Sequence, residues 1–331
     1  MKRQVFFNCN QDGVLPVSVA VYSLLRSADP TAPLAVHIAH DSGFAARGGR
    51  DRVREVVARF PFASVRFANF EPLLEPHRET LTAPKMKWPL MVWAWCFCTE
   101  LFPDVTGNLV FLDWDMYVLK DLRPLYELDL KAGNHVTAAV DESRREHRPY
   151  LVAAGWPEAA GYAVNTGTQV IDTDTYRRDR ILEKILAWYA KYKDVSLCVE
   201  QDAINAVAGE RIRRLHVKYN FTVGWCDRIM KFNPFRSELR VYPTQDVFAA
   251  VDDPTILHFI GHKKPWRWNH RAYRNLYRTS MKELGLYDGK AFGETPARAL
   301  VGVLFDLYHV LTRAYARIIL ATILRSRRQS A

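Results

Sequence analysis

The chain has 331 residues, of which 49% are hydrophobic, and this composition is typical of a folded protein and excludes a disordered one. Its net charge of +10 suits phosphate-bearing ligands or an anionic membrane; we expect no nucleic-acid partner, because the sequence has no zinc-finger spacing, RNP pattern or basic heptads. The five cysteines form no C-x-x-C pair, which argues against a zinc site or a disulfide framework.

The first third of the chain alternates short apolar runs with helical patterns. The predicted strands are Gln4–Cys9, Leu34–Ala39, Ser64–Phe70 and Asn108–Asp113, and the predicted helices are Leu15–Leu25, Asp51–Phe60 and Trp88–Leu101. This order predicts an α/β fold with a mainly parallel sheet flanked by helices on both faces. Ligands of open parallel sheets bind beyond the carboxyl ends of the strands, so we expect the chemistry at that edge.

The remainder of the chain is less regular. Its predicted strands are His135–Val140, Ala163–Ile171, Arg213–Tyr219 and Thr255–Ile260, and its predicted helices are Asp174–Tyr192 and Gln201–Val207. From Pro296 the pattern changes to one long apolar helix. We therefore expect a catalytic domain over residues 1–290 and a C-terminal helical segment over residues 291–331.

Two carboxylates lie at and just beyond the end of the predicted strand Asn108–Asp113. Asp113 and Asp115 are two residues apart, and in an extended chain such residues point to the same side. Two carboxylates at one strand end repel each other, and a divalent cation relieves that repulsion. Oxygen ligands suit magnesium and manganese, which bridge carboxylates to substrate phosphates. The alternative is a strand end that carries two solvated acids.

A histidine and a lysine form a second candidate cluster. His258 lies in the apolar run Ile256–Ile260, where a lone histidine is more often a packed core residue than a ligand. Gly261 permits a close approach of the backbone, and Lys264 adds a cation beside a rigid turn. We therefore predict that His258 binds the metal and that Lys264 binds a phosphate.

Four segments resemble the sequence blocks of glycosyltransferase family 8, which includes bacterial lipopolysaccharide galactosyl- and glucosyltransferases and glycogenin. In chain order they are FLDWDMYVLKDL (Phe111–Leu122), YAVNTGTQVIDTDTYRR (Tyr162–Arg178), EQDAIN (Glu200–Asn205) and ILHFIGHKKPW (Ile256–Trp266). The resemblance implies a GT-A type, Rossmann-like fold and a retaining hexosyltransferase. It implies UDP-galactose or UDP-glucose as donor, a hydroxyl of a cell-envelope glycan or glycolipid as acceptor, and Mn²⁺, or alternatively Mg²⁺, as cofactor.

The resemblance also implies a role for individual residues. It makes Asp113, Asp115 and His258 the metal ligands. Gln201 is expected close to the reacting carbon, and Asp202 is a second catalytic candidate, as a nucleophile only if its carboxylate points inward. The alternative is that both belong to a helix N-terminus whose dipole the acids suit. The donor-binding residues are expected to be Asn10, Asp12, Lys87, Asp113, Trp114, Asp115, Asp141, Asn165, Gly167, Glu200, Gln201, Gly261 and Lys264.

Two departures from the family pattern concern the donor. The stretch Phe7–Asp12 replaces the residues that read uracil and ribose in the family, and we expect Asn10 or Asp12 to serve instead. Glu200 stands where the family has aspartate, and its longer side chain is expected to affect the choice of donor sugar.

A third departure is the loss of a basic residue. The family has Arg or Lys in the helix before the D-x-D strand, and that position falls near Trp95 or Cys96 here. We expect Lys85 or Lys87, in the preceding turn, to compensate.

The segment Ala299–Leu324 is strongly apolar, with a narrow polar stripe that includes Asp306 and Arg313. No uninterrupted apolar run in it reaches the roughly 18 residues of a membrane span. A wide apolar face with basic residues at its end suits the plane of an anionic membrane, and the resemblance agrees. The alternative is a helix packed on its own domain or on a second subunit. Because Met1–Asn10 does not read as a signal peptide, we expect a cytoplasmic protein, peripheral on the inner face of the membrane.

Two other functions compete with this interpretation. A nucleotidyltransferase requires a Gly-rich phosphate loop near the first strand, and Asn8–Gly13 contains none. A non-catalytic, membrane-peripheral carbohydrate-binding protein on a degenerate transferase scaffold is favoured only by the altered uracil segment and the missing basic residue. The acidic pair, His258 and Lys264 argue against it. The stretch Trp266–His270 is expected either to stack on a sugar or to form a packed hinge.

Overall fold

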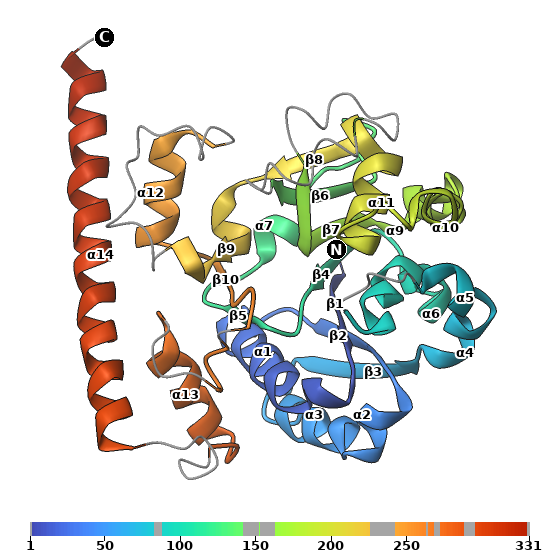
Figure 1. The fold of residues 1–331 in the computed structure, drawn as a ribbon, viewed down its shortest axis with the longest axis horizontal. Coiled ribbons are helices and arrows are strands. Elements are labelled where there is room, and N and C mark those ends of the chain that lie inside the picture. Colours follow the sequence, from blue (N-terminus) through green and yellow to red (C-terminus); the bar gives the residue numbers. More distant parts are fainter. Residues whose placement is uncertain are drawn as a thin grey trace.

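The computed structural model describes residues 2–82, 88–141, 152, 163–225, 242–262, 264–267, 272–287 and 295–329 (Figure 1). At its centre is a seven-stranded sheet in the order β3-β2-β1-β4-β7-β6-β8. Every strand of this sheet except β7 runs in the same direction. The prediction of a mainly parallel sheet is therefore confirmed. The strands are β1 (Arg3–Cys9), β2 (Leu34–His40), β3 (Ala63–Asn69), β4 (Asn108–Leu112), β6 (Thr137–Asp141), β7 (Val164–Asp172) and β8 (Ile212–Leu215).

Helices cover both faces of this sheet. The longer helices of the described residues are α1 (Val14–Ser27), α3 (Gly49–Val57), α9 (Thr173–Arg178), α10 (Ile181–Tyr192), α11 (Val199–Ala208), α12 (Thr244–Asp252), α13 (Arg274–Glu283) and α14 (Pro296–Gln329), of which α14 lies away from this sheet. The shorter ones are η1 (Gln11–Gly13), α2 (Ser42–Ala46), α4 (Glu71–Leu74), η2 (Glu75–His77), α5 (Arg78–Leu81), η3 (Leu90–Phe97), α6 (Cys98–Leu101), α7 (Arg123–Tyr126), η6 (Gly209–Arg211), η7 (Val217–Asn220) and η8 (Val223–Trp225).

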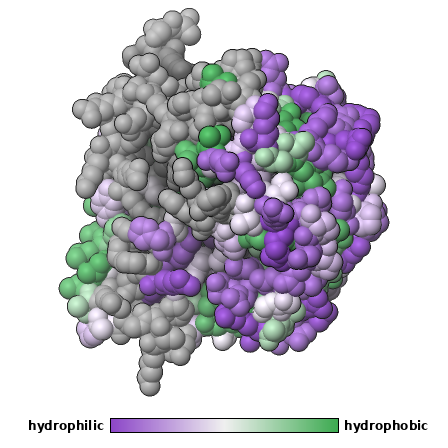
Figure 2. All heavy atoms as spheres, turned by 45° about the vertical axis from the view of Figure 1, so that its right-hand side comes forward, coloured by the Kyte–Doolittle hydropathy of each residue, from purple (hydrophilic) through white to green (hydrophobic). Residues whose placement is uncertain are grey.

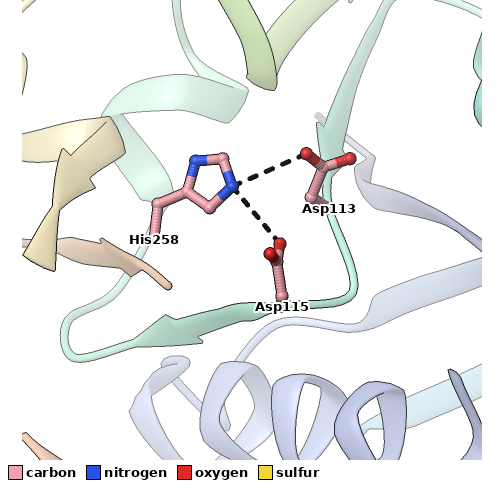
Figure 3. Close-up of side chains that lie close together, drawn as sticks. All are labelled: Asp113, Asp115 and His258. Atoms are coloured by element: carbon pink, nitrogen blue, oxygen red, sulfur yellow. Dashed lines mark ion pairs between the residues drawn. The ribbon is translucent and has the colours of Figure 1, made fainter. Parts of the chain in front are cut away.

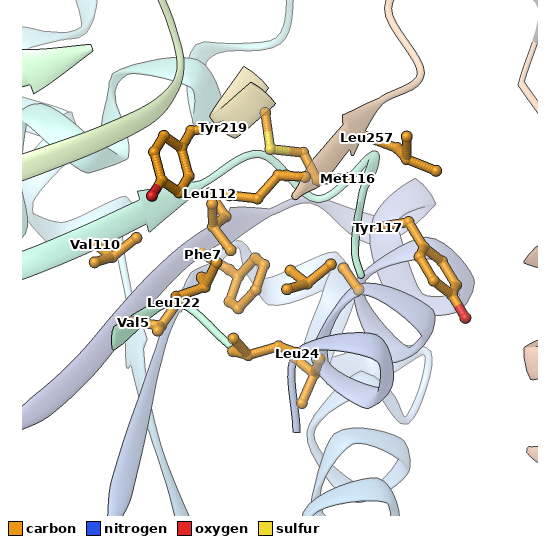
Figure 4. Close-up of a cluster of buried hydrophobic side chains, with 14 of the residues drawn as sticks. Val5, Phe7, Leu24, Val110, Leu112, Met116, Tyr117, Leu122, Tyr219 and Leu257 are labelled. Atoms are coloured by element: carbon orange, nitrogen blue, oxygen red, sulfur yellow. The ribbon is translucent and has the colours of Figure 1, made fainter. Parts of the chain in front are cut away.

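The alternation of side chains along β1 divides the core into two layers. Val5 and Phe7 pack with α1 and α3 on one face (Figure 4). Phe6 packs on the other face with Phe111 of β4 and with residues of η3, α10 and α11. Because successive side chains of a strand point to opposite faces, Asn8 lies on the same face as Phe6. This alternation of side chains along β1 places Asn8 on the face of the sheet where the candidate site lies.

Three predicted elements differ from the structure. The expected helix Trp88–Leu101 is η3 followed by α6; most of η3 is buried, so packing rather than an amphipathic 3.6-residue period sets its pitch. The expected helix Asp174–Tyr192 is divided into α9 and α10 at Arg180, whose φ is 52°. The expected strand Arg213–Tyr219 pairs only as β8 and continues as η7.

A second, three-stranded sheet meets the carboxyl end of β4. Its order is β5 (Met116–Val118), β10 (Ile256–His258) and β9 (Phe221–Thr222). In the antiparallel pair of β5 and β10, His258 lies opposite Met116. This register brings His258 next to the two aspartates that precede β5.

The long helix α14 lies along one side of the molecule, next to α12 and α13 (Figure 1). Polar contacts join it to these helices: Arg274 to Asp306 at 2.9 Å, and Arg317 to Asp252 at 2.5 Å. Its other face is apolar and exposed, and its side chains there are Leu300, Val301, Val303, Leu304, Leu307, Val310, Leu311 and Ile318. By contrast, the described residues on the face in Figure 2 are mostly hydrophilic. None of the described helices is apolar enough over a sufficient length to cross a membrane.

Candidate active site

Backbone hydrogen bonds fix the two aspartates where the two sheets meet. Leu112, the last residue of β4, lies opposite Thr168 of β7, and the next backbone N–H, from Asp113, donates to the carbonyl of Gly167 at 2.9 Å. Asp115 lies in the link between β4 and β5, and its carbonyl accepts from the N–H of Phe259 at 3.1 Å. The main sheet therefore holds Asp113, and the small sheet holds Asp115.

The structure brings together the three residues expected to bind a metal (Figure 3). Nε2 of His258 lies 3.3 Å from Oδ1 of Asp115 and 3.7 Å from Oδ2 of Asp113. One donor atom from each residue falls within 4.8 Å of the others. The His258 side chain is only 3% exposed, whereas that of Asp113 is 36% exposed, so the cluster opens toward solvent on the Asp113 side.

A chain of side-chain amides connects His258 to Gln201. Nδ1 of His258 lies 2.8 Å from Oδ1 of Asn220, whose Nδ2 donates to Oδ1 of Asn165 at 2.7 Å. Nδ2 of Asn165 donates in turn to Oε1 of Gln201 at 3.1 Å. The backbone N–H groups of Gly167 and Thr166 donate to Oδ1 of Asn165 and Oε1 of Gln201, at 3.0 and 3.3 Å.

The two backbone donors determine which way the side-chain amides point, and thereby the role of Nδ1 of His258. An N–H can only donate, so Oδ1 of Asn165 and Oε1 of Gln201 must be the acceptors, and each amide of the chain has one possible orientation. Oδ1 of Asn220 then faces His258, which must donate from Nδ1. The remaining nitrogen, Nε2, therefore faces Asp113 and Asp115 and is the ring atom available to a metal. This is the arrangement of a metal-binding histidine, whose ring is oriented by a hydrogen bond on the nitrogen that does not bind the metal.

Gly167 leaves the space that His258 occupies. A Cβ atom at this position would lie 2.5 Å from Cε1 of His258 and 2.9 Å from both Nδ1 of His258 and Cε of Met116. These distances are too short for any side chain, so the glycine is required by the close approach of the imidazole to β7.

Charge in the site is concentrated on the aspartates and Lys264. Nζ of Lys264 pairs with Asp115 and donates to the carbonyl of Phe259 at 2.7 Å. Burial opposes ionisation of Asp115, but Lys264 and His258 outweigh it and hold the pKa of Asp115 below its usual value. Burial and the neighbouring Asp115 raise the pKa of Asp113. A cation between these carboxylates would relieve this repulsion.

The cluster forms one wall of a pocket of about 450 Å³. Along the order of the main sheet, Asn8 lines it from β1, Asp113 from the end of β4, and Asn165 and Gly167 from β7. The remaining lining residues are Trp88, Pro89, Val92, Trp114, Asp115, Thr166, Cys198, Val199, Glu200, Gln201, His258, Ile260, Gly261 and Lys264. The site therefore runs from an apolar end at β1, past the charged cluster, to an amide-lined end at β7 and α11.

The three consecutive polar residues of α11 have different surroundings. Gln201 and Glu200 line the pocket, and burial raises the pKa of Glu200 well above its usual value. The Asp202 carboxylate instead accepts from Oγ of Ser196 at 2.8 Å and from two backbone N–H groups, at 2.9 and 2.6 Å. It is 1% exposed and is not among the residues that line the pocket, which favours a structural role at the start of α11.

Two of the residues expected to bind the donor do not reach the pocket. Oδ1 of Asn10 accepts from the N–H of Asp12 at 3.1 Å and caps η1. The Asp12 side chain is 55% exposed and lies 3.4 Å from Arg47. Both residues follow the end of β1, and neither is among the residues that line the pocket. Lys85, Lys87 and the side chain of Asp141 lie outside the described residues.

The stretch Trp266–His270, expected either to stack on a sugar or to form a packed hinge, is described only for its first two residues. Trp266 is 6% exposed, and its ring lies 5.3 Å from that of Tyr277 and 6.2 Å from that of Trp114. Trp266 is therefore a packed residue that supports Trp114, which lines the pocket. Residues 268–271 lie outside the described ranges.

Sequence reasoning missed Asn220 and Asn8. Both are buried asparagines next to apolar residues: Asn220 is 4% exposed and precedes Phe221, and Asn8 is 6% exposed and follows Phe7. A polar residue inside an otherwise buried run is costly unless it has a partner or a ligand. That signal was present in the sequence, but it does not indicate which side chains meet.

Comparisons with known proteins agree with this geometry. The sequence model described as Glycosyl transferase family 8 matches residues 4–270. The chain is 26% identical over 173 residues to general stress protein A of Bacillus subtilis (strain 168), covering 51% of this chain and 57% of that protein. It is 26% identical over 172 residues to glycosyltransferase GlyF of Streptococcus pneumoniae serotype 4, covering 51% of this chain and 36% of that protein. The alignments thus span little more than half, or less, of these relatives.

Solved structures share the fold. The galactosyltransferase LgtC, in complex with donor and acceptor sugar analogues, superposes with a TM-score of 0.71 at 21% identity, covering 88% of this chain and 99% of that one. The bifunctional glycosyltransferase WbbM superposes with a TM-score of 0.66 at 16% identity, covering 91% of this chain and 51% of that one.

Proposed function

This chain belongs to glycosyl transferase family 8, and on that premise we propose that it transfers galactose or glucose from the UDP-sugar to a hydroxyl of a cell-envelope glycan or glycolipid. The observation that carries the proposal is the convergence of Asp113, Asp115 and His258 in one wall of a pocket whose other end carries Gln201 and Asn165. A charged end suits a diphosphate, and neighbouring amides suit the hydroxyl groups of a hexose.

The three residues fit a divalent cation. They supply two carboxylates and an imidazole whose Nε2 faces them. This mixed oxygen and nitrogen set suits Mn²⁺ better than Mg²⁺, which prefers oxygen alone. The cation, when bound, supplies positive charge against the negative charge that grows on the leaving diphosphate.

The residues around the cluster have separate tasks in the proposed reaction. Lys264, which is paired with Asp115 in this structure, supplies a second positive charge for the diphosphate. Asn165 and Gln201 are held by the backbone of β7 and orient the sugar. The bond between the anomeric carbon and the diphosphate oxygen breaks with its electron pair on that oxygen. The acceptor hydroxyl forms the new bond on the same face, and its proton passes to the departing diphosphate.

The surroundings of Asp202 support attack on the same face. A double displacement requires a carboxylate near the anomeric carbon. The Asp202 carboxylate accepts three hydrogen bonds at the start of α11, and Gln201, which does line the pocket, is a poor nucleophile. Glu200 also lines the pocket, but burial raises its pKa and so disfavours the ionised carboxylate that would attack. Retention by same-face attack is therefore the mechanism that we favour.

Release of nucleotide from a panel of nucleotide-sugars tests the function. We expect Mn²⁺-dependent release of UDP from UDP-galactose or UDP-glucose, abolished by chelator and reduced at least about 100-fold in Asp115→Ala. Asp51→Ala is the matched control, since Asp51 is an exposed aspartate of α3 with one local ion pair. No release from any donor, together with metal-independent nucleotide binding, would instead favour a non-catalytic carbohydrate-binding protein.

We further propose that residues 291–331 hold the enzyme on the inner face of an anionic membrane. Polar contacts fix one face of α14 on α12 and α13, so packing on its own domain leaves the opposite apolar face uncovered. Arg325, Arg327 and Arg328 follow in the sequence, and basic residues near an apolar face favour an anionic membrane.

Sedimentation with phosphatidylglycerol vesicles tests this proposal. We expect the wild type to co-sediment and Leu307→Glu, which alters an exposed residue of the apolar face, to remain in solution. Val195→Glu, a change at a similarly exposed valine outside α14, is the control. If the wild type instead forms dimers that Leu307→Glu dissociates, a second subunit covers the face.

A further inference from the structure

Helix α13 lies between α14 and α1 and is anchored at both of its ends (Figure 1). At its first residue, Arg274 pairs with Asp306 of α14 at 2.9 Å. At its last residue, Glu283 accepts a hydrogen bond from Arg26 of α1 at 2.8 Å. Tyr277, almost one turn after Arg274, therefore projects from a helix that two other helices hold in place.

The ring of Tyr277 packs against the chain on both sides of Lys264. It is fully buried, and its centroid lies 5.5 Å from that of Phe259 in an edge-to-face arrangement. The Trp266 ring stacks on it at 5.3 Å. Both separations lie in the range at which aromatic rings attract each other. A single side chain of α13 thus holds the residues that precede and follow Lys264 in the sequence.

The same two aromatic residues hold the ammonium group of Lys264. Its Nζ donates to the carbonyl of Phe259 at 2.7 Å and lies 5.8 Å from the centroid of the Trp266 ring, whose face attracts a cation. A third contact of Nζ is with Asp115 of the metal-binding cluster. Two of these three contacts therefore depend on residues that pack against Tyr277.

The ring of Tyr277, rather than its hydroxyl group, makes these contacts. The hydroxyl is buried and has no hydrogen-bond partner among the described residues. Tyr277 is also not among the residues that line the pocket, whereas Lys264 is. Any influence of Tyr277 on a ligand must therefore pass through the residues that it holds.

We propose that Tyr277 is a positioning residue that fixes Lys264 at the phosphate-binding end of the pocket. Tyr277 holds Phe259 and Trp266, and these two residues hold the ammonium group, so a helix outside the pocket determines where the cation lies inside it. This inference rests on the proposed function, because it takes Lys264 to bind the diphosphate of the donor. It gives α13 a part in donor binding although Tyr277 itself touches no ligand.

A double-mutant cycle on UDP binding, measured by titration calorimetry with Mn²⁺, tests the proposal. Lys264→Gln should bind UDP roughly 10- to 100-fold more weakly than the wild type, because a charged contact to the diphosphate is lost. Tyr277→Leu should bind UDP roughly 3- to 30-fold more weakly, because Lys264 is no longer held in place. In the Lys264→Gln background the same change should alter the affinity less than about twofold, since the group that Tyr277 positions is absent.

Two further variants control for the ring and for the loss of packing. Tyr277→Phe keeps the ring and should bind UDP as the wild type does. Tyr126→Leu is the matched control, because Tyr126 is a buried tyrosine of α7 whose hydroxyl also has no partner among the described residues. It should lower the melting temperature without changing the affinity for UDP. If Tyr277→Leu does not fold, Tyr277→Met, which fills more of the space, takes its place in the cycle.

The possible results separate this inference from the proposed function. An equal loss of UDP affinity from Tyr277→Leu in both backgrounds would overturn the inference alone, since Tyr277 would then act independently of Lys264. Wild-type affinity in folded Tyr277→Leu would overturn it as well. Wild-type affinity in Lys264→Gln would overturn both this inference and the phosphate-binding role of Lys264. Failure of the wild type to bind UDP at all would overturn the proposed function together with the inference.

Discussion

Replacement of Asn220 should weaken metal binding although Asn220 touches no metal. Its Oδ1 receives the Nδ1–H of His258, and its Nδ2 donates to Asn165. In Asn220→Ala the imidazole loses the hydrogen-bond partner that orients its ring, so Nε2 is no longer held toward Asp113 and Asp115. Loss of such an outer partner typically reduces metal affinity about 10- to 100-fold, which corresponds to about 1.4–2.8 kcal/mol.

This magnitude agrees with the contact that is removed. An unsatisfied buried donor costs about 1–3 kcal/mol, and His258 is 3% exposed, so water does not easily replace Asn220. Asn220→Asp keeps an acceptor for Nδ1–H but cannot donate to Asn165. It should therefore bind metal more tightly than Asn220→Ala.

Calorimetric titration with Mn²⁺ measures the effect, and Asn108→Ala supplies the control. Asn108 lies at the opposite end of β4, where its Nδ2 donates to the carbonyls of Tyr126 and Leu128. Its loss should lower the melting temperature without changing the dissociation constant for Mn²⁺. The role assigned to Asn220 would be refuted if Asn220→Ala bound Mn²⁺ as tightly as the wild type while remaining folded.

Three further predictions follow from other contacts. Gly167→Ala should destabilise the fold by about 1–3 kcal/mol and weaken Mn²⁺ binding, because the new Cβ displaces His258. Denaturant unfolding and titration with Mn²⁺ measure the two effects, and an unchanged affinity for Mn²⁺ would contradict the prediction. Asp202→Ala should lower the free energy of unfolding by about 1–2 kcal/mol, because three hydrogen bonds are lost. Its turnover per folded molecule should stay within about threefold of the wild type, and a loss of 100-fold or more would instead indicate a direct catalytic role. Burial lowers the pKa of His37 to about 4 from its usual 6.5, so below pH 6.5 the unfolded chain binds a proton that the folded chain does not. The free energy of unfolding should therefore fall by on the order of 3 kcal/mol as the pH drops from 6.5 toward 4. Unfolding curves measured between pH 4 and 7 should show a weaker pH dependence in His37→Leu.

The parts of the fold that follow a simple period could be predicted from the sequence. Short buried strands such as Leu34–His40 read as continuous apolar runs, and the amphipathic helices between them follow a 3.6-residue spacing. Leu90–Phe97 could not be predicted in this way, because its pitch depends on packing against Phe6 and Phe111 rather than on its own pattern.

The candidate site was predictable only where chemistry and spacing coincide. Asp113 and Asp115 share a strand end, and their repulsion indicates a cation without knowledge of the fold. Asn220 and Asn8 are found only once β9, β10 and β1 are placed, because their partners are 38 and 83 residues away in the chain. Asp202 was a candidate because a carboxylate can act in catalysis. In the structure, however, its side chain accepts hydrogen bonds at the start of α11 and does not line the pocket.

The amide chain from His258 to Gln201 has a consequence for how the site responds to acid. The side chains of Asn220, Asn165 and Gln201 that make up this chain are neutral. Hydrogen bonds from two backbone N–H groups of β7 fix their orientation, and these N–H groups neither take up nor release a proton. A histidine oriented by a carboxylate can lose its alignment when that carboxylate is protonated. Here groups that do not titrate orient the histidine. Acid can therefore release a metal from Asp113, Asp115 and His258 without changing the hydrogen bonds that orient His258 for metal binding.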